Sequence, residues 1–266
     1  MFRRIIFILA FFFIPCLATA QQIVIPSGSQ MVIGSGSQIW NPVAAGGSCG
    51  AINGTYNENF NGSTLCATGH TSNCNNTWTV GAESFPINFA NTVSSITGGL
   101  GAPFTNCTYA ANLYSTTSGS NVGFSLDFGS DQTDLSGRFY FNIHSIQDTS
   151  GLFAITDSSG VYAWHVRLET TGQIDLLVSG GTAVSTAPGA FTVDTPHYID
   201  FKSHYNGPVS IMLDGNLSSA LTGTMSYNYH MRQIKISNNP NATSARVNFN
   251  ITGIQWTFQN AYLGGP

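Results

Sequence analysis

Short segments of alternating apolar and polar residues dominate the stretch between Gly137 and Gly215, and turn residues separate them. The alternation runs through residues 139–144, 162–169 and 198–202, with the period of two that is typical of a β-strand with one buried face. No part of the chain shows helical periodicity with caps. The sequence therefore predicts an all-β chain of about a dozen strands, the size expected of two packed antiparallel sheets.

The start of the chain has the layout of a cleavable secretory signal. Arg3 and Arg4 supply a positive start, residues 5–14 form an apolar core, and small residues follow at 18–20. The apolar core is too short to span a bilayer, although a retained anchor is the alternative to cleavage. We expect residues 1–20 to be a signal peptide, so that the mature chain is secreted, held at the cell surface or kept in the periplasm. No later segment is long and apolar enough for a membrane helix, so no membrane span is expected after cleavage.

A separate piece follows the signal at residues 21–46. It contains a near-repeat of period eight, in which the segment 25–30 (Ile-Pro-Ser-Gly-Ser-Gln) is echoed by 33–38 (Ile-Gly-Ser-Gly-Ser-Gln). Two copies are too few for a repeat array, which needs more units to bury a core. We interpret residues 21–46 as an N-terminal arm or linker and residues 47–266 as one β-sandwich domain.

Charge is scarce in this chain. Charged residues make up 8% of it and the formal net charge is -4. Loss of the two positive charges of Arg3 and Arg4 with the signal would change this from -4 to -6. Because nucleic-acid binding requires clustered Lys and Arg to neutralise phosphates, the composition argues against a nucleic-acid partner.

The cysteines agree with export. Four remain in the mature chain, namely Cys49, Cys66, Cys74 and Cys107. An even number in an oxidising compartment predicts two disulfides, with three pairings open. We favour Cys66 with Cys74 and Cys49 with Cys107. A metal site is the competing interpretation, but no pair has Cys-x-x-Cys spacing and only His70 lies close by.

Four segments occur in an order and spacing that point to a known fold. They are Glu58-Asn59-Phe60 with the later Trp78, the strand Phe139–His144, the strand His197–Lys202 leading to Leu213-Asp214-Gly215, and the terminal Leu263–Pro266. Together they resemble the concanavalin A-like lectin and glucanase superfamily, in particular its laminin G-like (LamG) members. The resemblance covers roughly residues 55–266. It implies a jelly roll, an antiparallel β-sandwich of two sheets, one of them concave.

The superfamily includes enzymes as well as binding proteins, so the resemblance alone assigns no activity. Its laminarinase-type glucanases share a Glu-x-Asp-x-x-Glu strand, whose carboxylates act as acid and nucleophile. The glutamates here are Glu58, Glu83 and Glu169, and none has a second carboxylate two or four residues away in a strand. We therefore assign no catalytic residue. The expected function is a secreted, non-catalytic binding or adhesion module for a glycan or cell-surface polymer.

The outward-facing side chains of the predicted strands are the candidate carbohydrate-binding residues, because they mix flat rings with amide and charged groups. The set comprises Tyr140, Asn142, His144, His165, Arg167, Tyr198, Asp200 and Lys202. The ligand would lie on the concave sheet of the resemblance or against its edge loops. The competing interpretation is that these side chains are only the solvated faces of half-buried strands.

Two other functions stay open. A polysaccharide lyase could use Tyr140, His144, His165 and Arg167 to abstract a proton beside a uronate. A structural surface protein would instead pack its sandwich against other chains and bind no sugar.

No cofactor is expected, although the resemblance leaves calcium open. Asp127, Asp131 and Asp134 lie in a turn-rich stretch and could supply oxygen ligands. Their spacing is not that of an EF-hand loop, and Asp at turns usually forms local hydrogen bonds. Some relatives pair a first-strand Glu with a last-strand Asp. Glu58 is present here, but residues 250–255 of the last strand contain no Asp.

Overall fold

The computed structural model describes residues 56–58, 79–80, 92–97, 100, 109–116, 122–179, 181–225, 229–238 and 245–263. The predicted signal peptide, the arm at 21–46 and all four cysteines of the mature chain lie outside these residues. The disulfides and the domain boundaries therefore stay predictions. Within the residues just given, no helix has the length and apolar character needed to cross a membrane.

Two antiparallel sheets contain the fifteen strands of the described residues. One sheet consists of β1 (Tyr56–Glu58), β3 (Thr92–Thr97), β4 (Tyr109–Ser115), β6 (Asp134–Ile146), β11 (Pro196–His204), β12 (Pro208–Leu213), β13 (Leu221–Thr224) and β15 (Val247–Thr257). The other consists of β2 (Thr79–Val80), β5 (Gly123–Gln132), β7 (Ser150–Thr156), β8 (Tyr162–Leu168), β9 (Ile174–Val178), β10 (Val184–Ser185) and β14 (Met231–Ser237). A short 3-10 helix, η1 (Leu217–Ser219), follows β12.

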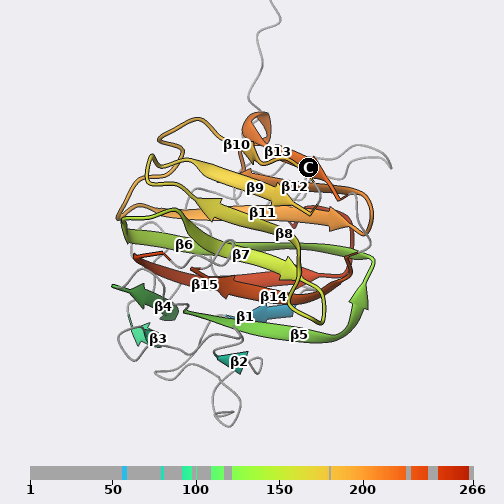
Figure 1. The fold of residues 1–266 in the computed structure, drawn as a ribbon, viewed down its shortest axis with the longest axis horizontal. Helices are drawn as coiled ribbons and strands as arrows, with labels where there is room; N and C mark the ends of the chain where they lie inside the picture. The colour runs from blue at the N-terminus through green and yellow to red at the C-terminus, as the bar shows by residue number, and fades with distance from the viewer. Residues whose placement is uncertain are drawn as a thin grey trace, which may run out of the picture. The chain divides into compact units, whose positions relative to one another are not determined.

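The predicted two-sheet antiparallel β-sandwich is confirmed. The eight-stranded sheet has the order β13-β12-β11-β6-β15-β4-β3, with β1 paired to β15, and the seven-stranded sheet has the order β10-β9-β8-β7-β14-β5-β2. In Figure 1 the strands of the two sheets overlap face to face, with β7 and β8 drawn across β6 and β11. Neighbours in each sheet are often distant in sequence, because the chain crosses repeatedly from one sheet to the other.

The inner faces of the two sheets meet in one apolar core. Phe139 of β6 stacks on Phe153 of β7, with ring centroids 4.4 Å apart. Trp164 of β8 and Phe201 of β11 extend this contact, with centroids 5.3 Å apart. Each such buried aromatic side chain stabilises the fold by about 1.5–3 kcal/mol. The alternation predicted along residues 139–144 and 198–202 thus puts one side of each strand in the core.

Strand β15 changes phase along its length. In its first half odd-numbered residues such as Ile251 are buried in the core, and in its second half the even-numbered Trp256 is buried there. The register against β6 shifts between Thr252 and Gln255, where Gly253 has a φ of 56°. A β-bulge at this glycine reverses which side chains face inward.

Gly137 of β6 lies where β15 and the core approach each other closely. A Cβ added to it would overlap the carbonyl oxygen of Gln255 and the ring of Phe201. We expect Gly137→Ala to lower the free energy of unfolding by about 1–3 kcal/mol, measured by urea denaturation. Ser130→Ala, at an exposed position of β5, is the control and should change it by less than about 0.5 kcal/mol. An unchanged midpoint for Gly137→Ala would contradict the close approach.

Candidate functional site on the seven-stranded sheet

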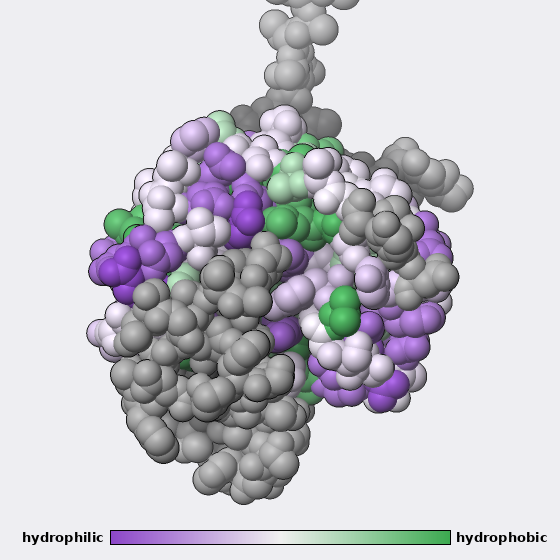
Figure 2. Space-filling model, in the orientation of Figure 1, coloured by the Kyte–Doolittle hydropathy of each residue, from purple (hydrophilic) through white to green (hydrophobic). Residues whose placement is uncertain are grey.

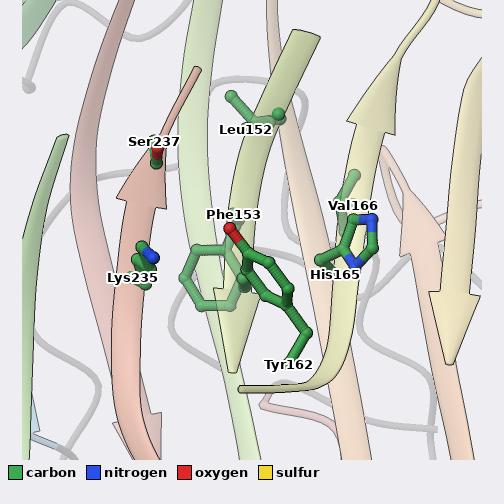
Figure 3. A pocket seen from close by; sticks show the side chains of 9 residues that line it. Leu152, Phe153, Tyr162, His165, Val166, Lys235 and Ser237 are labelled. Atoms are coloured by element: carbon green, nitrogen blue, oxygen red, sulfur yellow. The ribbon is translucent and has the colours of Figure 1, made fainter. Parts of the chain in front are cut away.

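Three strands place Lys235, Ala154 and His165 in one row on the outer face of the seven-stranded sheet. Ala154 of β7 is in register with Lys235 of β14 on one side and with His165 of β8 on the other. Because alanine is small, the row contains a hollow of about 10 Å³, room for one water-sized group. Tyr162 also lines it (Figure 3). Its ring centroid lies 4.9 Å from that of His165 and 5.1 Å from the Lys235 Nζ.

His165 is uncharged at neutral pH. Burial lowers the pKa of its imidazole to about 4, the positive charge of Arg167 adds to this, and Asp175 opposes it. The residue is only 7% exposed, and its Nε2 is buried without a hydrogen-bond partner among the described residues. A buried polar atom left unpaired costs free energy. The protein therefore leaves Nε2 as an unsatisfied polar atom on a residue that lines the hollow.

Arg167, also on β8, is held between two carboxylates. Its Nη2 lies 2.6 Å from Asp175 Oδ2, and its Nε lies 3.0 Å from Glu169 Oε1. Although burial opposes it, hydrogen bonds from Gln173, Ser185 and Arg167 keep the pKa of Asp175 below its ordinary value. Figure 2 shows hydrophilic residues over the left part of β8 and β9, beside a hydrophobic patch over the right part of β9. The positive charge of Arg167 is thus balanced within the protein.

Of the residues that line this hollow, the sequence predicted His165 as a candidate but not Tyr162 or Lys235. The alternation along residues 162–169 places Tyr162 on the same side as the core residue Trp164. The register between β7 and β8 shifts between Ile155 and Thr156, however, and Tyr162 lines the outer hollow instead. In β14, Lys235 lies between two isoleucines of the core, and this alternation is the sequence signal that Lys235 faces outward. The row itself depends on strand order, which alternation does not reveal.

Six of the eight candidates lie on the other sheet. Tyr140, Asn142 and His144 belong to β6, and Tyr198, Asp200 and Lys202 belong to its neighbour β11. All six alternate with core residues and so lie on the outer face of the eight-stranded sheet. The structure therefore divides the predicted set between two faces. The four lyase candidates do not share one sheet.

Asp200 is part of a covered ion pair rather than an open surface. Arg138 Nε lies 2.6 Å from Asp200 Oδ1, its Nη2 donates to Asp200 Oδ2 at 2.9 Å, and Nη2 also donates to the carbonyl of Leu263 at 3.2 Å. Burial raises the pKa of Asp200, and the charge of Arg138 opposes that rise. Nearby, the Lys202 Nζ lies 4.6 Å from the ring centroid of Tyr262. The residues before the C-terminus thus occupy this part of the face.

His144 joins a row of amide side chains farther along β6. Asn250 Nδ2 donates to His144 Nε2 at 2.9 Å, so the Nδ1–H of the imidazole donates to Asp194 Oδ1 at 2.8 Å. Asn112 Nδ2 donates to Asn250 Oδ1 at 2.8 Å and extends the row to β4. Asn142, on the same face, is 5% exposed and its Oδ1 has no partner among the described residues. The row is polar and largely satisfied by its own hydrogen bonds.

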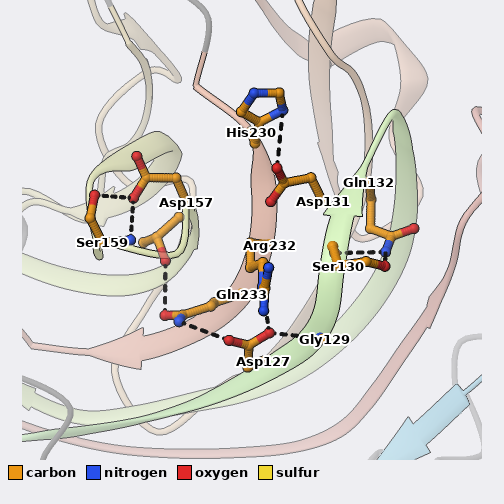
Figure 4. Close-up of polar contacts among 11 residues, drawn as sticks. Asp127, Gly129, Ser130, Asp131, Gln132, Asp157, Ser159, His230, Arg232 and Gln233 are labelled. Atoms are coloured by element: carbon orange, nitrogen blue, oxygen red, sulfur yellow. Dashed lines mark hydrogen bonds and ion pairs between the residues drawn. The ribbon is translucent and has the colours of Figure 1, made fainter.

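The three aspartates considered for calcium do not fit a shared ion. Asp127 Oδ1 accepts from Arg232 Nε at 2.8 Å, Asp131 Oδ2 lies 3.5 Å from His230 Nδ1, and Asp134 Oδ1 lies 2.7 Å from His204 Nδ1. Figure 4 shows Asp127 and Asp131 directed at different partners. Across the described ranges, no group of three or more His, Cys, Asp and Glu side chains could hold a metal.

Known proteins that resemble this chain were found by comparison of structures and not by comparison of sequences. No protein-family model matches the chain, and no curated protein matches it in sequence. A solved structure of the cellulose-induced protein Cip1 has a TM-score of 0.50 and 10% identity, covering 68% of this chain and 91% of that one. The T. cruzi calreticulin globular domain has a TM-score of 0.50 and 10% identity, covering 77% and 88%.

A sialidase is also similar, with a TM-score of 0.49 and 8% identity over 68% of this chain. The chain spans only 17% of the length of that sialidase. At these identities the likeness concerns the fold alone. The chain has a two-sheet antiparallel β-sandwich fold of the jelly-roll type, as the sequence predicted.

Proposed function

We propose that the chain is a secreted, LamG-like glycan-binding module without catalytic activity, and that the hollow beside His165 receives a hydroxyl group of the glycan. The observation that carries this proposal is the buried, unpartnered Nε2 of an uncharged imidazole. A hydroxyl group has the size of the hollow. Once a small shift of the neighbouring side chains exposes Nε2, the tautomer with its proton on Nδ1 accepts a hydrogen bond from that hydroxyl group.

The surroundings of the hollow suit a sugar ring. Tyr162 offers part of a flat aromatic face, and Leu177, the in-register partner of His165 on β9, is only partly buried and adds apolar surface. Lys235 places an ammonium group in the same hollow, and ammonium groups donate to hydroxyl oxygens. An apolar surface with a few fixed polar groups is the usual composition of a small-ligand site.

A binding role fits this face better than hydrolysis does. Glycoside hydrolysis needs two carboxyl groups, one to donate a proton and one to attack or to activate water. Asp175 and Glu169, the carboxylates beside Arg167 on this face, are both held by it, and Asp127 of β5 is held by Arg232. Because hydrogen bonds from Gln173, Ser185 and Arg167 keep the pKa of Asp175 low, this carboxylate does not serve as the proton donor.

A lyase is the second candidate, and one observation favours it. An unprotonated imidazole with an unpartnered Nε2 beside a tyrosine has the composition of a proton-abstracting site. The imidazole of His165, with its pKa of about 4, is however a weak base, because efficient general bases have a pKa near the working pH. We therefore place binding ahead of elimination, and a structural role without sugar binding third.

The test is a panel of polysaccharides offered to the mature protein with and without calcium. Retention, new reducing ends and the ultraviolet absorbance of unsaturated products are read together. We expect retention without product, and His165→Phe should weaken it at least about tenfold, because the ring loses its hydrogen-bond acceptor. His204→Ala, on β11 of the other sheet, is the control and should bind like the parent chain.

Each other outcome has a defined meaning. Unsaturated product that disappears in His165→Phe would replace the binding module with a lyase. Equal retention by His165→Phe and the parent chain would remove the hollow from the site. No retention and no product would favour the structural role.

A further inference from the structure

A second hollow lies at the edge of the sandwich, between two loops. One loop comprises residues 186–190, directly after β10, and the other runs from Leu213 through the Asp-Gly turn into η1. Figure 1 shows β10 and η1 close together at this edge. The hollow has a volume of about 400 Å³, and ligand sites in proteins span about 300–1,000 Å³. It shares no lining residue with the hollow beside His165.

The structure holds Asp214, a lining residue of this hollow, in a fixed orientation. Asp214 and Gly215 have φ values of 50° and 72°, which define a tight turn after β12. Asp214 Oδ1 accepts a hydrogen bond from the backbone N–H of Tyr198 at 2.9 Å, and Oδ2 lies 2.7 Å from His197 Nδ1. Each carboxylate oxygen keeps a second lone pair, and the side chain is 41% exposed. The carboxylate is therefore a preoriented acceptor.

Hydrogen-bond donors and apolar surface lie beside this acceptor. Asn216 Oδ1 accepts from the backbone N–H and the hydroxyl of Ser218, at 3.2 Å and 2.6 Å. This leaves the amide N–H groups of Asn216 as donors at the hollow. Leu213 and Pro188 supply apolar lining. A carboxylate next to an amide N–H matches two neighbouring hydroxyl groups, since each hydroxyl both donates and accepts.

The charges exclude an acidic ligand. No Lys or Arg lines the hollow, and Asp214 would repel an anion. Elsewhere in the mature chain each arginine already pairs with a carboxylate, namely Arg138 with Asp200, Arg167 with Asp175 and Glu169, Arg232 with Asp127, and Arg246 with Asp148. We propose that the edge hollow binds a neutral sugar through two adjacent hydroxyl groups. This site is separate from the His165 hollow and does not depend on it.

A pair of substitutions in η1 tests the place of binding. Saturation-transfer NMR of the full mature chain with glucose, galactose and mannose should detect at least one of these sugars, and glucuronate should give no signal. Ser219→Trp puts a large ring at a lining position and should abolish the signal. Leu217→Trp, two residues away, is exposed and does not line the hollow, so it should retain the signal.

A second pair tests the chemistry. Asp214→Asn keeps the size of the side chain and its fit to positive φ, but it removes the charge, so affinity should fall at least about tenfold. Asp194→Asn is the matched control, because Asp194 also has positive φ (57°) and also contacts a histidine Nδ1, but it does not line the hollow. It should bind like the parent chain.

Three results would overturn the proposal. They are the absence of any neutral-sugar signal, an equal signal from glucuronate, and a signal that survives Ser219→Trp. If His165→Phe loses the signal and Ser219→Trp keeps it, the sugar binds on the seven-stranded sheet instead. This outcome would reject the edge site and leave the function proposed above in place.

Discussion

Asp200→Ala is expected to lower the free energy of unfolding by about 3–5 kcal/mol, because it leaves a buried arginine without its counter-charge. The side chains of Arg138 and Asp200 are 5% and 1% exposed, and two parallel hydrogen bonds join them. Burial has removed both groups from water, so neither can be resolvated in place when the other is lost. The measurement is urea denaturation of the parent chain and the variant at neutral pH.

The double variant Arg138→Met, Asp200→Leu separates the cost of an unpaired charge from the value of the pair. Replacing a whole buried pair with apolar side chains of similar size is often neutral or stabilising, so the double variant should recover most of the lost stability. The hydrogen bond from Arg138 to the Leu263 carbonyl is lost in it, which costs about 1 kcal/mol. A double variant as unstable as Asp200→Ala would contradict this account.

Local alternation predicted the strands well because it reports a local property, namely which side of a strand is buried. Phe139 and Phe141 face the core as their spacing indicated. The same pattern cannot tell which sheet a strand joins. His165 and Tyr140 occupy equivalent positions in similar alternations, but β8 and β6 lie in different sheets. The candidate side chains therefore face outward, as alternation indicates, but the topology divides them between two sheets.

The sequence also could not show what covers an outward-facing side chain. Asp200 has the pattern of a solvated residue, but the segment that reaches Leu263 lies over it. The edge hollow depends in the same way on distant segments, since residues 186–190 meet the turn at Asp214. The sequence showed the Asp-Gly turn itself, but it did not show that this turn forms a hollow together with a second loop. Both cases involve contacts between segments far apart in the chain, which carry no periodic signal.

The burial of His165 has a measurable consequence for acid stability. The imidazole has a pKa of about 4 in the folded protein and about 6.5 in an unfolded chain. Between these values the unfolded state binds a proton that the folded state does not, so stability falls as the pH is lowered from 6.5 to 4. The difference corresponds to about 3 kcal/mol. Above pH 6.5 this contribution is fully present and does not change.

His165→Phe isolates this contribution, because it removes the titrating group and keeps a ring of similar shape in place. Other groups also affect acid stability. Asp148, with its pKa lowered to about 2 by hydrogen bonds from Arg246, contributes stability that is lost below pH 3.8 in both proteins. The quantity to compare is therefore the change in unfolding free energy between pH 7 and pH 4.5. The parent chain should lose about 2–3 kcal/mol more than the variant over that interval.

Equal losses would mean that His165 takes up a proton in the folded protein as readily as in the unfolded chain. The site would then present a cation to its ligand rather than the neutral acceptor on which the proposed hydroxyl contact depends.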